Sequence, residues 1–394
     1  MKIAINGAGI AGTTLAYFLR KSGHEVLLIE AAPRLRSGGY LIDFWGGGYD
    51  IAERMGLIPQ LRSLGYEMRE VRYTDEHGHR TGGFPVEPFR RMTNDRFLDV
   101  RRSDLAASIY NAIDGDVETL FADSIAGCED MGDRVHVRFD HAAPRDVDLV
   151  VGADGLHSRV RGLVFAPQAD VEVRLGYHVA AFEVEGYRPR EELVFVNHAA
   201  PGRQVSRLSM CDDRTMFLFI FRDEYLPDGT PSNDLERKAA LRAVFGDVGW
   251  ECPRILESMD GVCDIYFDRV SQIRMDAWTK GRSALVGDAA ACVSLLAGEG
   301  TGLAMMEAYV LAGELHRAKG DHAAAFANYQ ALMKPFVEKK QHAAVRLAPA
   351  FAPKSSLGIH FRDNLMRLLR IPVVADVAIG RVLRDDIEIP EYAF

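Results

Sequence analysis

Glycines at a fixed spacing follow the first apolar segment of the chain, residues 2–6 (KIAIN). They form a G-x-G-x-x-G motif that consists of Gly7, Ala8, Gly9, Ile10, Ala11 and Gly12. The first glycine allows a tight turn, the second lets the backbone approach a pyrophosphate, and the third lets a helix pack close to the strand. Free N–H groups at the start of that helix favour a phosphate. The motif therefore predicts that a dinucleotide binds at residues 7–12.

A carboxylate follows at the position where a ribose would bind. The run Glu25–Glu30 (EVLLIE) is apolar in its middle, as expected for a buried parallel strand. Glu30 ends this run, 18 residues after Gly12, and can accept hydrogen bonds from an adenosine ribose. Because an acid at this point disfavours a phosphorylated ribose, the pattern favours FAD or NAD over NADP.

A second polar motif follows the buried strand at 147–151. Asp154-Gly155 comes directly after the strand, and a polar turn with Ser158 and Arg159 follows. Taken alone, an Asp-Gly pair after a strand indicates only a turn. The Asp154-Gly155 pair becomes informative because it lies between two other glycine-rich segments.

The third motif follows another buried strand, 283–286. Gly287-Asp288 ends the strand, and a loop that contains Gly298 and Gly300 leads into a helix near Thr301. The side chain of Asp288 can hold a polyol hydroxyl group. The N–H groups at the start of the helix can face a partial negative charge.

In this order, the three motifs resemble those of the class A flavin-dependent monooxygenases, the para-hydroxybenzoate hydroxylase-like family. The matching segments are 7–12, 148–161 and 281–288. Val100–Leu105 (VRRSDL) also resembles the Arg-x-x-Leu helix start of the family, and the loop 38–43 resembles that of the tetracycline-inactivating and polyketide-tailoring hydroxylases. The resemblance covers about residues 1–345.

The resemblance implies a chemistry and its partners. One non-covalent FAD would be reduced by NADPH or NADH, which has no Rossmann domain of its own. The reduced flavin would react with O2 to give a C4a-hydroperoxide, which transfers an oxygen atom to an electron-rich aromatic or enol carbon. The substrate would be an aromatic, polycyclic or polyketide-like small molecule in a buried apolar pocket.

The resemblance also implies roles for single residues. The helix from Thr301 would place its positive end near the flavin N1–C2=O edge, and Asp288 would bind the ribityl chain. Arg102 and Arg36 would lie near the pyrophosphate or the nicotinamide, and Asp154 would fix this cluster. The expected cofactor-binding residues are Gly7, Ala8, Gly9, Ile10, Ala11, Gly12, Glu30, Arg36, Asp43, Arg102, Asp154, Gly155, Gly287, Asp288, Gly298, Gly300, Thr301 and Gly302. No catalytic residue and no metal ligand is assigned.

The sequence departs from the family in two places. The family commonly has His and then Pro after the Gly-Asp-Ala-Ala run, whereas residues 291–295 (ACVSL) contain neither. Glu299 stands where a Gln is usual. Because the loop would pass the reactive face of the flavin, the position of the substrate cannot be transferred from the family.

Aromatic residues between positions 177 and 221 are candidates for substrate contacts. Phe217, Phe219 and Phe221 alternate on one face of a strand, and Met216, Leu218 and Ile220 lie on the other. One face could line the substrate cavity, and a plain sheet core is an equal alternative. Further candidates are Trp45, Tyr177 and Phe182, with His178 as a possible general base.

The elements that must position these residues indicate an α/β protein with two domains. A βαβ opening and a helix over 301–318 predict a Rossmann-like FAD-binding domain of the para-hydroxybenzoate hydroxylase type. Short β-rich runs predict an antiparallel substrate domain. The expected segments are 1–67, 100–170 and 270–345 for the FAD domain, 68–99 and 171–269 for the substrate domain, and 346–394 for a helical C-terminal segment. Residues 38–48 are expected to form a glycine- and aromatic-rich loop.

Composition narrows the setting of the protein. The 394 residues carry a net charge of −9 with a pI near 5.8, which argues against nucleic acid or an anionic membrane as partner. The five cysteines show no CxxC pair, which excludes a disulfide framework and standard zinc spacings. No apolar run reaches about 20 residues, so we expect no transmembrane helix and a cytoplasmic protein. The oligomeric state stays open.

Three alternatives remain beside a hydroxylase. One is a flavoprotein cyclase or isomerase with structural FAD, which the altered 291–295 loop motivates. Another is an epoxidising or Baeyer-Villiger-type tailoring enzyme, and the last is a flavin-binding sensor or carrier without turnover. A flavin halogenase is disfavoured, because Trp45, Trp250 and Trp278 form no Trp-x-Trp pair.

Overall fold

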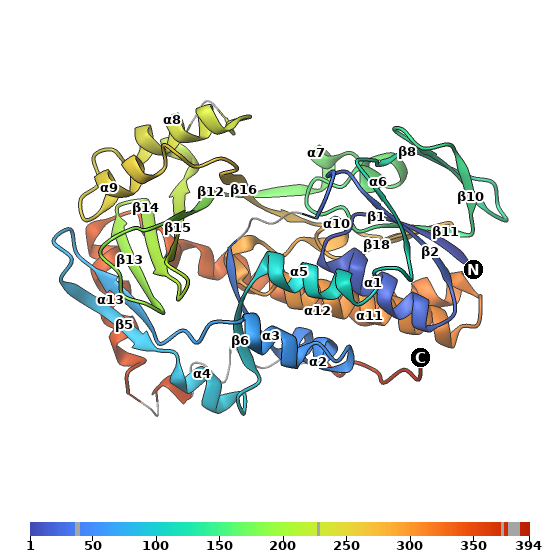
Figure 1. The fold of residues 1–394 in the computed structure, drawn as a ribbon, viewed down its shortest axis with the longest axis horizontal. Coiled ribbons are helices and arrows are strands. Elements are labelled where there is room, and N and C mark those ends of the chain that lie inside the picture. Colours follow the sequence, from blue (N-terminus) through green and yellow to red (C-terminus); the bar gives the residue numbers. More distant parts are fainter. Residues whose placement is uncertain (36–39, 227–228, 372–373, 377–386) are drawn as a thin grey trace.

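Two large sheets dominate the computed structural model, which describes residues 1–35, 40–226, 229–371, 374–376 and 387–394 (Figure 1). One sheet has six strands in the order β17-β18-β11-β1-β2-β7. In chain order these strands are β1 (Lys2–Asn6), β2 (Glu25–Glu30), β7 (Glu118–Phe121), β11 (Leu149–Gly152), β17 (Thr279–Lys280) and β18 (Ser283–Leu285). All neighbours pair in parallel except β17 and β18. The fold class is therefore the expected α/β class.

Helices and a small sheet cover the faces of the six-stranded sheet, which explains the continuous apolar runs in its strands. The long helices of this part are α1 (Ile10–Lys21), α5 (Arg102–Asn111), α11 (Gly300–Arg317) and α12 (His322–Phe351). A small antiparallel sheet consists of β8 (Ile125–Asp130), β9 (Val135–Phe139) and β10 (Arg145–Val147). Side chains of these helices and of the small sheet join the strands in one hydrophobic core.

The second sheet has seven strands in the order β16-β12-β15-β14-β13-β4-β5. Its strands are β4 (Glu70–Thr74), β5 (Arg80–Pro85), β12 (Glu172–Glu185), β13 (Val194–Ala200), β14 (Arg203–Ser209), β15 (Arg214–Arg222) and β16 (Tyr266–Ile273). Pairing is antiparallel except between β13 and β4. Two helices that the sequence did not indicate, α8 (Asp234–Phe245) and α9 (Cys252–Ser258), cover one face.

The segment expected as a loop at 38–48 is more regular in its described part. Leu41–Trp45 forms β3, which pairs with β6 (Phe97–Arg101), and Gly46–Arg54 forms α2. The strand alternates as a half-buried strand should, with Ile42 and Phe44 buried. Gly48 allows close contact between α2 and α11, because a Cβ at this position would lie 2.6 Å from the Cα of Gly302.

The remaining elements are short. They are α3 (Ile58–Leu64), α4 (Glu87–Met92), α6 (Arg159–Val164), α7 (Gln168–Val171), η1 (Asp223–Tyr225), α10 (Asp288–Ala291), η2 (Leu295–Ala297) and α13 (Ser356–Leu368). None of the described helices combines the length and the apolar character needed to cross a bilayer.

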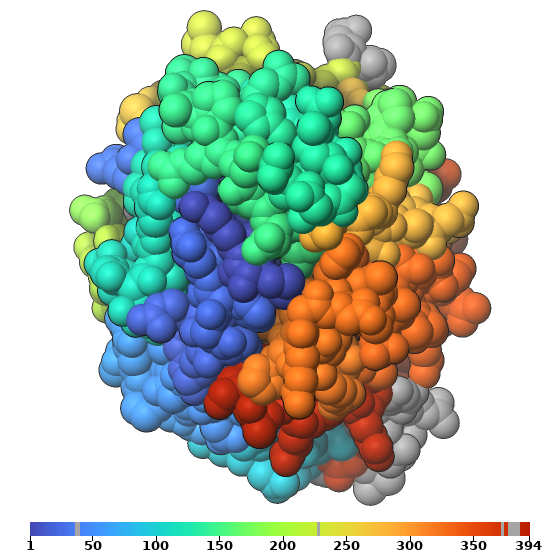
Figure 2. All heavy atoms as spheres, turned by 90° about the vertical axis from the view of Figure 1, so that its right-hand side faces the viewer, coloured from blue at the N-terminus to red at the C-terminus, as the bar shows by residue number. Residues whose placement is uncertain are grey.

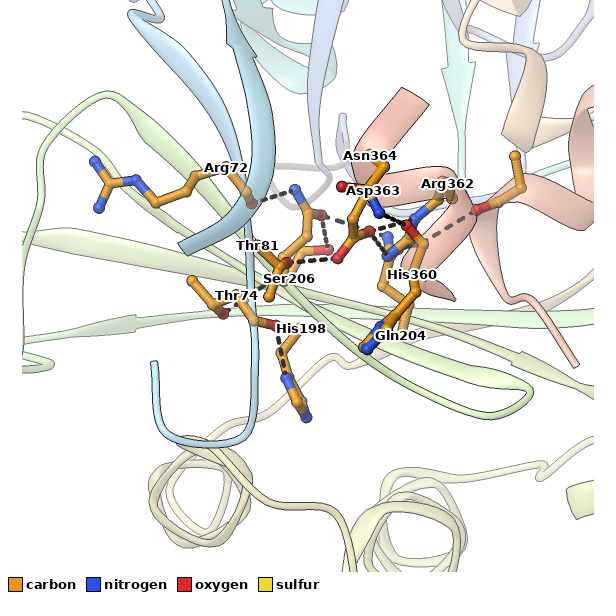
Figure 3. A network of polar contacts seen from close by, with 12 residues as sticks. Arg72, Thr74, Thr81, His198, Gln204, Ser206, His360, Arg362, Asp363 and Asn364 are labelled. Atoms are coloured by element: carbon orange, nitrogen blue, oxygen red, sulfur yellow. Dashed lines mark hydrogen bonds and ion pairs between the residues drawn. The ribbon is translucent and has the colours of Figure 1, made fainter. Parts of the chain in front are cut away.

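Helix α13 is held on the seven-stranded sheet by a buried polar network (Figure 3). The guanidinium of Arg362 donates to Gln204 Oε1 at 2.8 Å and lies 4.4 Å from the ring centre of Tyr73. Arg362 also pairs with Asp363 at 2.9 Å, and the Thr81 hydroxyl donates to Asp363. Since both charges are buried and partnered, the network fixes α13 in one position.

The last residues differ from the helical tail expected to reach Phe394. Residues 387–394, here called the C-terminal strap, have no helix and pack against the core of the six-stranded sheet. Figure 2 shows the red C-terminal residues between the blue N-terminal segment and the orange helices. The ring of Phe394 lies 4.9 Å from that of Phe18 on α1 and 5.6 Å from that of Tyr309 on α11.

Candidate functional site

The glycine motif forms the turn from β1 into α1. Gly7 has a φ of +109°, and a Cβ there would lie 2.5 Å from the carbonyl oxygen of Ala153. A Cβ on Gly12 would overlap the carbonyl oxygen of Gly7. Gly9 is the N-cap of α1, and no described atom lies within 4 Å of where its Cβ would be. The turn is thus tight on its protein side and open at the start of the helix.

Glu30 lies beside this turn at the end of β2. Its Oε2 accepts the N–H of Ala8 at 2.9 Å, and its Oε1 accepts the N–H of Ala32 at 2.9 Å. These two amides orient the carboxylate toward the strand ends, next to the N-terminus of α1.

Asp154 ties the second motif to β1. Its Oδ2 accepts the side-chain amide of Asn6 at 2.9 Å and the N–H groups of Arg159 and Val160 at 2.8 and 3.1 Å. The hydroxyl of Ser158 donates to its Oδ1. Its contacts therefore hold the 154–160 turn against the first strand. The next residue, Gly155, has a φ of +78°.

A buried arginine that the sequence did not single out joins the second and third motifs. Arg161 is fully buried and donates to the carbonyl oxygens of Ala289 at 3.0 Å and Leu156 at 2.6 Å. Burial lowers the pKa of its guanidinium. The motif residues give no signal for this role, because an arginine after a polar turn is usually exposed.

Gly287 and Glu307 join the third motif to α11. The N–H of Gly287 donates to Glu307 Oε2 at 2.6 Å, and the hydroxyl of Tyr329 lies 3.2 Å from the same oxygen. Glu307 is 1% exposed, and burial raises its pKa to about 8. A glutamate inside an apolar helix is the only sequence signal for this residue.

Asp288 lies just after β18, in a group of side chains here called the Asp288 cluster. Four other side chains interact with it or with each other there: Tyr40, Arg102, Tyr266 and Cys292. Arg102 is exposed and Asp288 is half-buried, although protein surrounds both. Burial raises the pKa of Asp288, and the charge of Arg102 opposes that shift. The rings of Tyr40 and Tyr266 lie 5.8 Å apart.

The N-terminus of α11 opens on a pocket, here called the α11 pocket. It is lined by Asp43, Phe44, Trp45, Gly47, Gly48, Gly298, Glu299, Gly302, Leu303 and Met306. Gly298 has a φ of +70°, and Gly300 and Thr301 form the first turn. No side chain of the described residues caps this helix, because its N-cap Glu299 pairs with Lys340 at 2.8 Å instead. The N–H groups of the first turn are therefore available to a bound group.

Two buried glutamines hold the loop that lacks the His and Pro of the family. The amide of Gln341 donates to the carbonyl oxygens of Ile273 at 2.7 Å and Cys292 at 3.0 Å. The amide of Gln272 donates to Val293 at 2.7 Å. Ser294 has a φ of +124°, a conformation that is costly for a serine. The loop is thus fixed by side chains that lie far away in sequence, which sequence spacing could not reveal.

The sequence left open whether one face of the strand 215–222 lines a substrate cavity. The structure shows that the face with the phenylalanines lies under α8 and α9. Phe217, Phe219 and Phe221 are fully buried there, and the ring of Phe182 stacks on that of Phe219 at 5.8 Å. The phenylalanines are buried because the apolar faces of α8 and α9 pack against this side of the sheet. None of these four rings lines the α11 pocket.

The other residues proposed for substrate contacts lie in different parts of the structure. Trp45 opens on the α11 pocket. Tyr177 is buried on the sheet face opposite to the phenylalanines, and the guanidinium of Arg222 lies 4.9 Å from its ring centre. His178 is 2% exposed, stacks on Phe221 at 5.3 Å, and has its Nδ1 3.0 Å from Asp223. Burial lowers the pKa of His178, and its position is in the helix-covered core.

The structure thus brings the three motifs to one edge of the six-stranded sheet, with Glu30 and Arg102 beside them. Arg36 and part of the 38–43 loop lie outside the described residues. The sequence missed Asp99, which faces Asp43 across the β3–β6 ladder, besides the buried groups described above. Its signal, an acid inside the apolar run 97–100, was present but not specific.

Comparisons with known proteins agree with this geometry. Residues 51–341 match a family described as FAD binding domain, and residues 5–47 match one described as NAD(P)-binding Rossmann-like domain. An uncharacterised protein of Mycobacterium tuberculosis (strain CDC 1551 / Oshkosh) is 37% identical, with 89% of this chain and 94% of that protein aligned. A flavin-dependent monooxygenase from an unknown prokaryotic organism is 35% identical, with 90% of each chain aligned. The crystal structure of the tetracycline destructase Tet(51) superimposes with a TM-score of 0.84 at 32% identity over 99% of both chains.

Proposed function

The chain belongs to the FAD-binding-domain family of flavin-dependent monooxygenases, and from this premise we propose that it hydroxylates an aromatic or polyketide-like small molecule. Bound FAD, once reduced by NADPH or NADH, supplies the oxygen-activating chemistry. The protein supplies a binding site, orientation and protection from water.

The residues at the sheet edge fit the parts of this cofactor. The open start of α1 at Gly9 suits the pyrophosphate, because free N–H groups and the helix dipole favour a phosphate. The oriented carboxylate of Glu30 suits the adenosine ribose. Asp288 suits the ribityl hydroxyl groups, and Arg102 places a positive charge beside it. The uncapped N-terminus of α11 suits the electron-rich edge of a reduced flavin.

The Asp288 cluster is the observation that carries the substrate class. It joins proposed cofactor residues to Tyr266 of the seven-stranded sheet, and the rings of Tyr40 and Tyr266 lie 5.8 Å apart. Flat rings favour a flat, conjugated substrate. The similarity to the tetracycline destructase Tet(51) over 99% of both chains supports a polycyclic substrate and a role in antibiotic modification.

A non-redox flavoprotein remains the second candidate, because residues 291–295 replace the usual His and Pro beside the cofactor. In such a cyclase or isomerase the FAD would be structural. Epoxidation and ester insertion would share the oxygen requirement of hydroxylation.

Oxygen consumption separates the candidates. We expect purified protein to be yellow, and polycyclic phenols and enols to stimulate NADPH or NADH oxidation with matching O2 uptake. Products should gain the mass of one oxygen atom, and hydrogen peroxide measured in parallel shows how much reductant is used without transfer. A yellow protein that converts a compound without O2 uptake would instead establish the non-redox candidate.

A further inference from the structure

Asp43 and Asp99 are two acids that stand opposite each other at the floor of the α11 pocket. Their strands β3 and β6 are antiparallel, and the two residues are direct partners in the ladder. Side chains of direct partners on one face of a ladder are in contact range. Asp43 lines the pocket, whereas Asp99 behind it is 1% exposed.

One carboxylate oxygen of Asp99 remains available for an interaction with Asp43. Its Oδ2 accepts the N–H of Met68 at 3.0 Å and faces the guanidinium of Arg90 at 3.3 Å. Its Oδ1 is buried and accepts no hydrogen bond from any donor group of the described residues. A carboxylate at Asp43 would repel it, whereas one proton held between the two groups satisfies Oδ1.

The surrounding charges do not remove the need for that proton. Arg90 is the cation beside Asp99, and its other nitrogen faces Glu67 at 3.5 Å. On the pocket side, Lys340 is paired with Glu299. Burial and then the charge of Asp43 raise the pKa of Asp99, although Met68 and Arg90 oppose the shift, and burial raises the pKa of Asp43.

We propose that Asp43 and Asp99 share one proton and that Asp43 presents it to the flavin group held at the N-terminus of α11. When negative charge develops on that group, the Asp43 O–H is the donor, and the pair is left with both carboxylates ionised. When the charge leaves, the same proton returns to the pair. Asp99 acts through Asp43, and is therefore a positioning residue. The inference rests on the FAD site and is independent of the substrate class.

Matched amide variants test the shared proton. In Asp99→Asn the side-chain oxygen can still accept from Met68, and the new N–H2 group can donate to Asp43. Asp43→Asn makes the mirror-image change. Each variant leaves a single carboxylate, so near neutral pH it keeps the charge of the wild-type pair but lacks the shared proton. Glu307→Gln is the control, because it removes a different buried acid.

Infrared spectroscopy of the holoenzyme reads the proton directly. In the wild type we expect a protonated-carboxyl band near neutral pH that disappears as the pH rises from about 7 to about 10. Glu307 gives a second protonated-carboxyl band in this pH range, which Glu307→Gln identifies by removing it. Either Asn variant should lose the other band, the one assigned to the pair, and Glu307→Gln should keep it. An unchanged band in both Asn variants would overturn the proposal, and apoprotein spectra give the same answer if a variant binds FAD poorly.

The midpoint potential of the bound flavin tests the link to the pocket. A charge that appears on the pair at high pH makes reduction of the flavin harder, so the wild-type potential should fall more steeply across that titration. Because Glu307 gains its charge in the same pH range, the comparison is made in a Glu307→Gln background. There the extra steepness should persist, and adding either Asn substitution should remove it. Parallel curves with and without the Asn substitutions would refute the transfer step. Neither measurement uses a substrate, so a wrong substrate class leaves both results intact.

Discussion

Glu307 illustrates how a single residue can make stability depend on pH. It lies inside α11, and within the described part of the chain no salt bridge reaches it. The native protein favours its neutral form, since the N–H of Gly287 and the Tyr329 hydroxyl replace only part of the water that the charge would need. Glu307 thus holds the N–H of Gly287, and its buried carboxyl group makes the stability of the protein depend on pH.

The pH dependence has a definite sign. The pKa of Glu307 is raised to about 8 in the folded protein from 4.5, so between these values the native state binds more protons than the unfolded state. Stability must then fall as the pH rises through this window, by an amount of the order of a few kcal/mol, since one pKa unit is about 1.4 kcal/mol. Glu307→Gln removes the titration, and its Tm relative to wild type should rise steadily from about pH 5 to about pH 8.

Calorimetric Tm values at several pH values check this expectation. Glu314→Gln is the matched control, because Glu314 is also buried in α11 but pairs with Arg317 at 3.0 Å. That variant should lose Tm through the broken pair. If the Tm difference between Glu307→Gln and wild type is the same at every pH, the buried acid is not the source of the dependence.

At the residue scale, the sequence predicted the groups at strand ends and missed the groups behind them. Gly7, Glu30 and Asp288 stand in motifs whose order along the chain is informative. Arg161 and Asp99 act only through contacts with distant segments, and no local pattern records such contacts. The phenylalanine alternation showed a strand correctly, but which face is covered depends on α8 and α9, which come later in the chain.

At the scale of elements, two helix N-termini form part of the proposed cofactor site. Both α1 and α11 begin without a side-chain cap from the described residues, and glycines lead into both. The sequence predicted these two helices well because strand, glycine turn and apolar helix face coincide. It did not predict β3 or the start of α2, because glycines that permit helix contact look like loop residues in a single sequence.

The two glycines of the α1 turn should respond differently to one added methyl group. Gly9 has a φ of −75° and a ψ of −174°, which alanine also adopts, and no described atom occupies the space of its Cβ. Gly9→Ala should therefore keep the wild-type Tm without FAD and weaken FAD binding at least about tenfold, since about 1.4 kcal/mol corresponds to that factor. Gly12→Ala should lose about 1–3 kcal/mol of stability, because its methyl group overlaps the Gly7 carbonyl.

Thermal unfolding of the apoproteins and titration with FAD, followed by flavin fluorescence, measure both quantities. The contrast between the variants is the decisive result. Wild-type FAD affinity in Gly9→Ala would show that the pyrophosphate does not lie at the start of α1.

At the scale of the whole molecule, the C-terminal strap links α1 and α11, the two helices whose N-termini we propose for the cofactor site. Tyr392 donates from its hydroxyl to Glu314 at 2.7 Å, and its ring lies 5.2 Å from that of Tyr309. A Cβ on Gly313 would overlap the Tyr392 ring, so α11 leaves room for the strap. Arg317 lies 4.8 Å from the centre of the same ring.

Tyr392→Ala should therefore destabilise the protein although residue 392 is far from the cofactor residues in sequence. We expect a loss of about 1–3 kcal/mol, less than for a fully buried aromatic ring. Glu388→Ala is the control, because Glu388 is exposed in the same strap. Urea unfolding of both variants measures the difference, and equal midpoints would mean that the strap contributes no stability.

The strand order of the six-stranded sheet also sets the time at which the protein can mature during its synthesis. β18 lies beside β11, and the Gly287-Asp288 pair follows it directly. A domain folds as a unit when its segments have left the ribosome, so about three quarters of the chain must be translated before all three motifs can meet. FAD loading is therefore an event of late translation or of the released chain. A nascent chain that stops before residue 283 would carry the first glycine turn and still lack the cofactor.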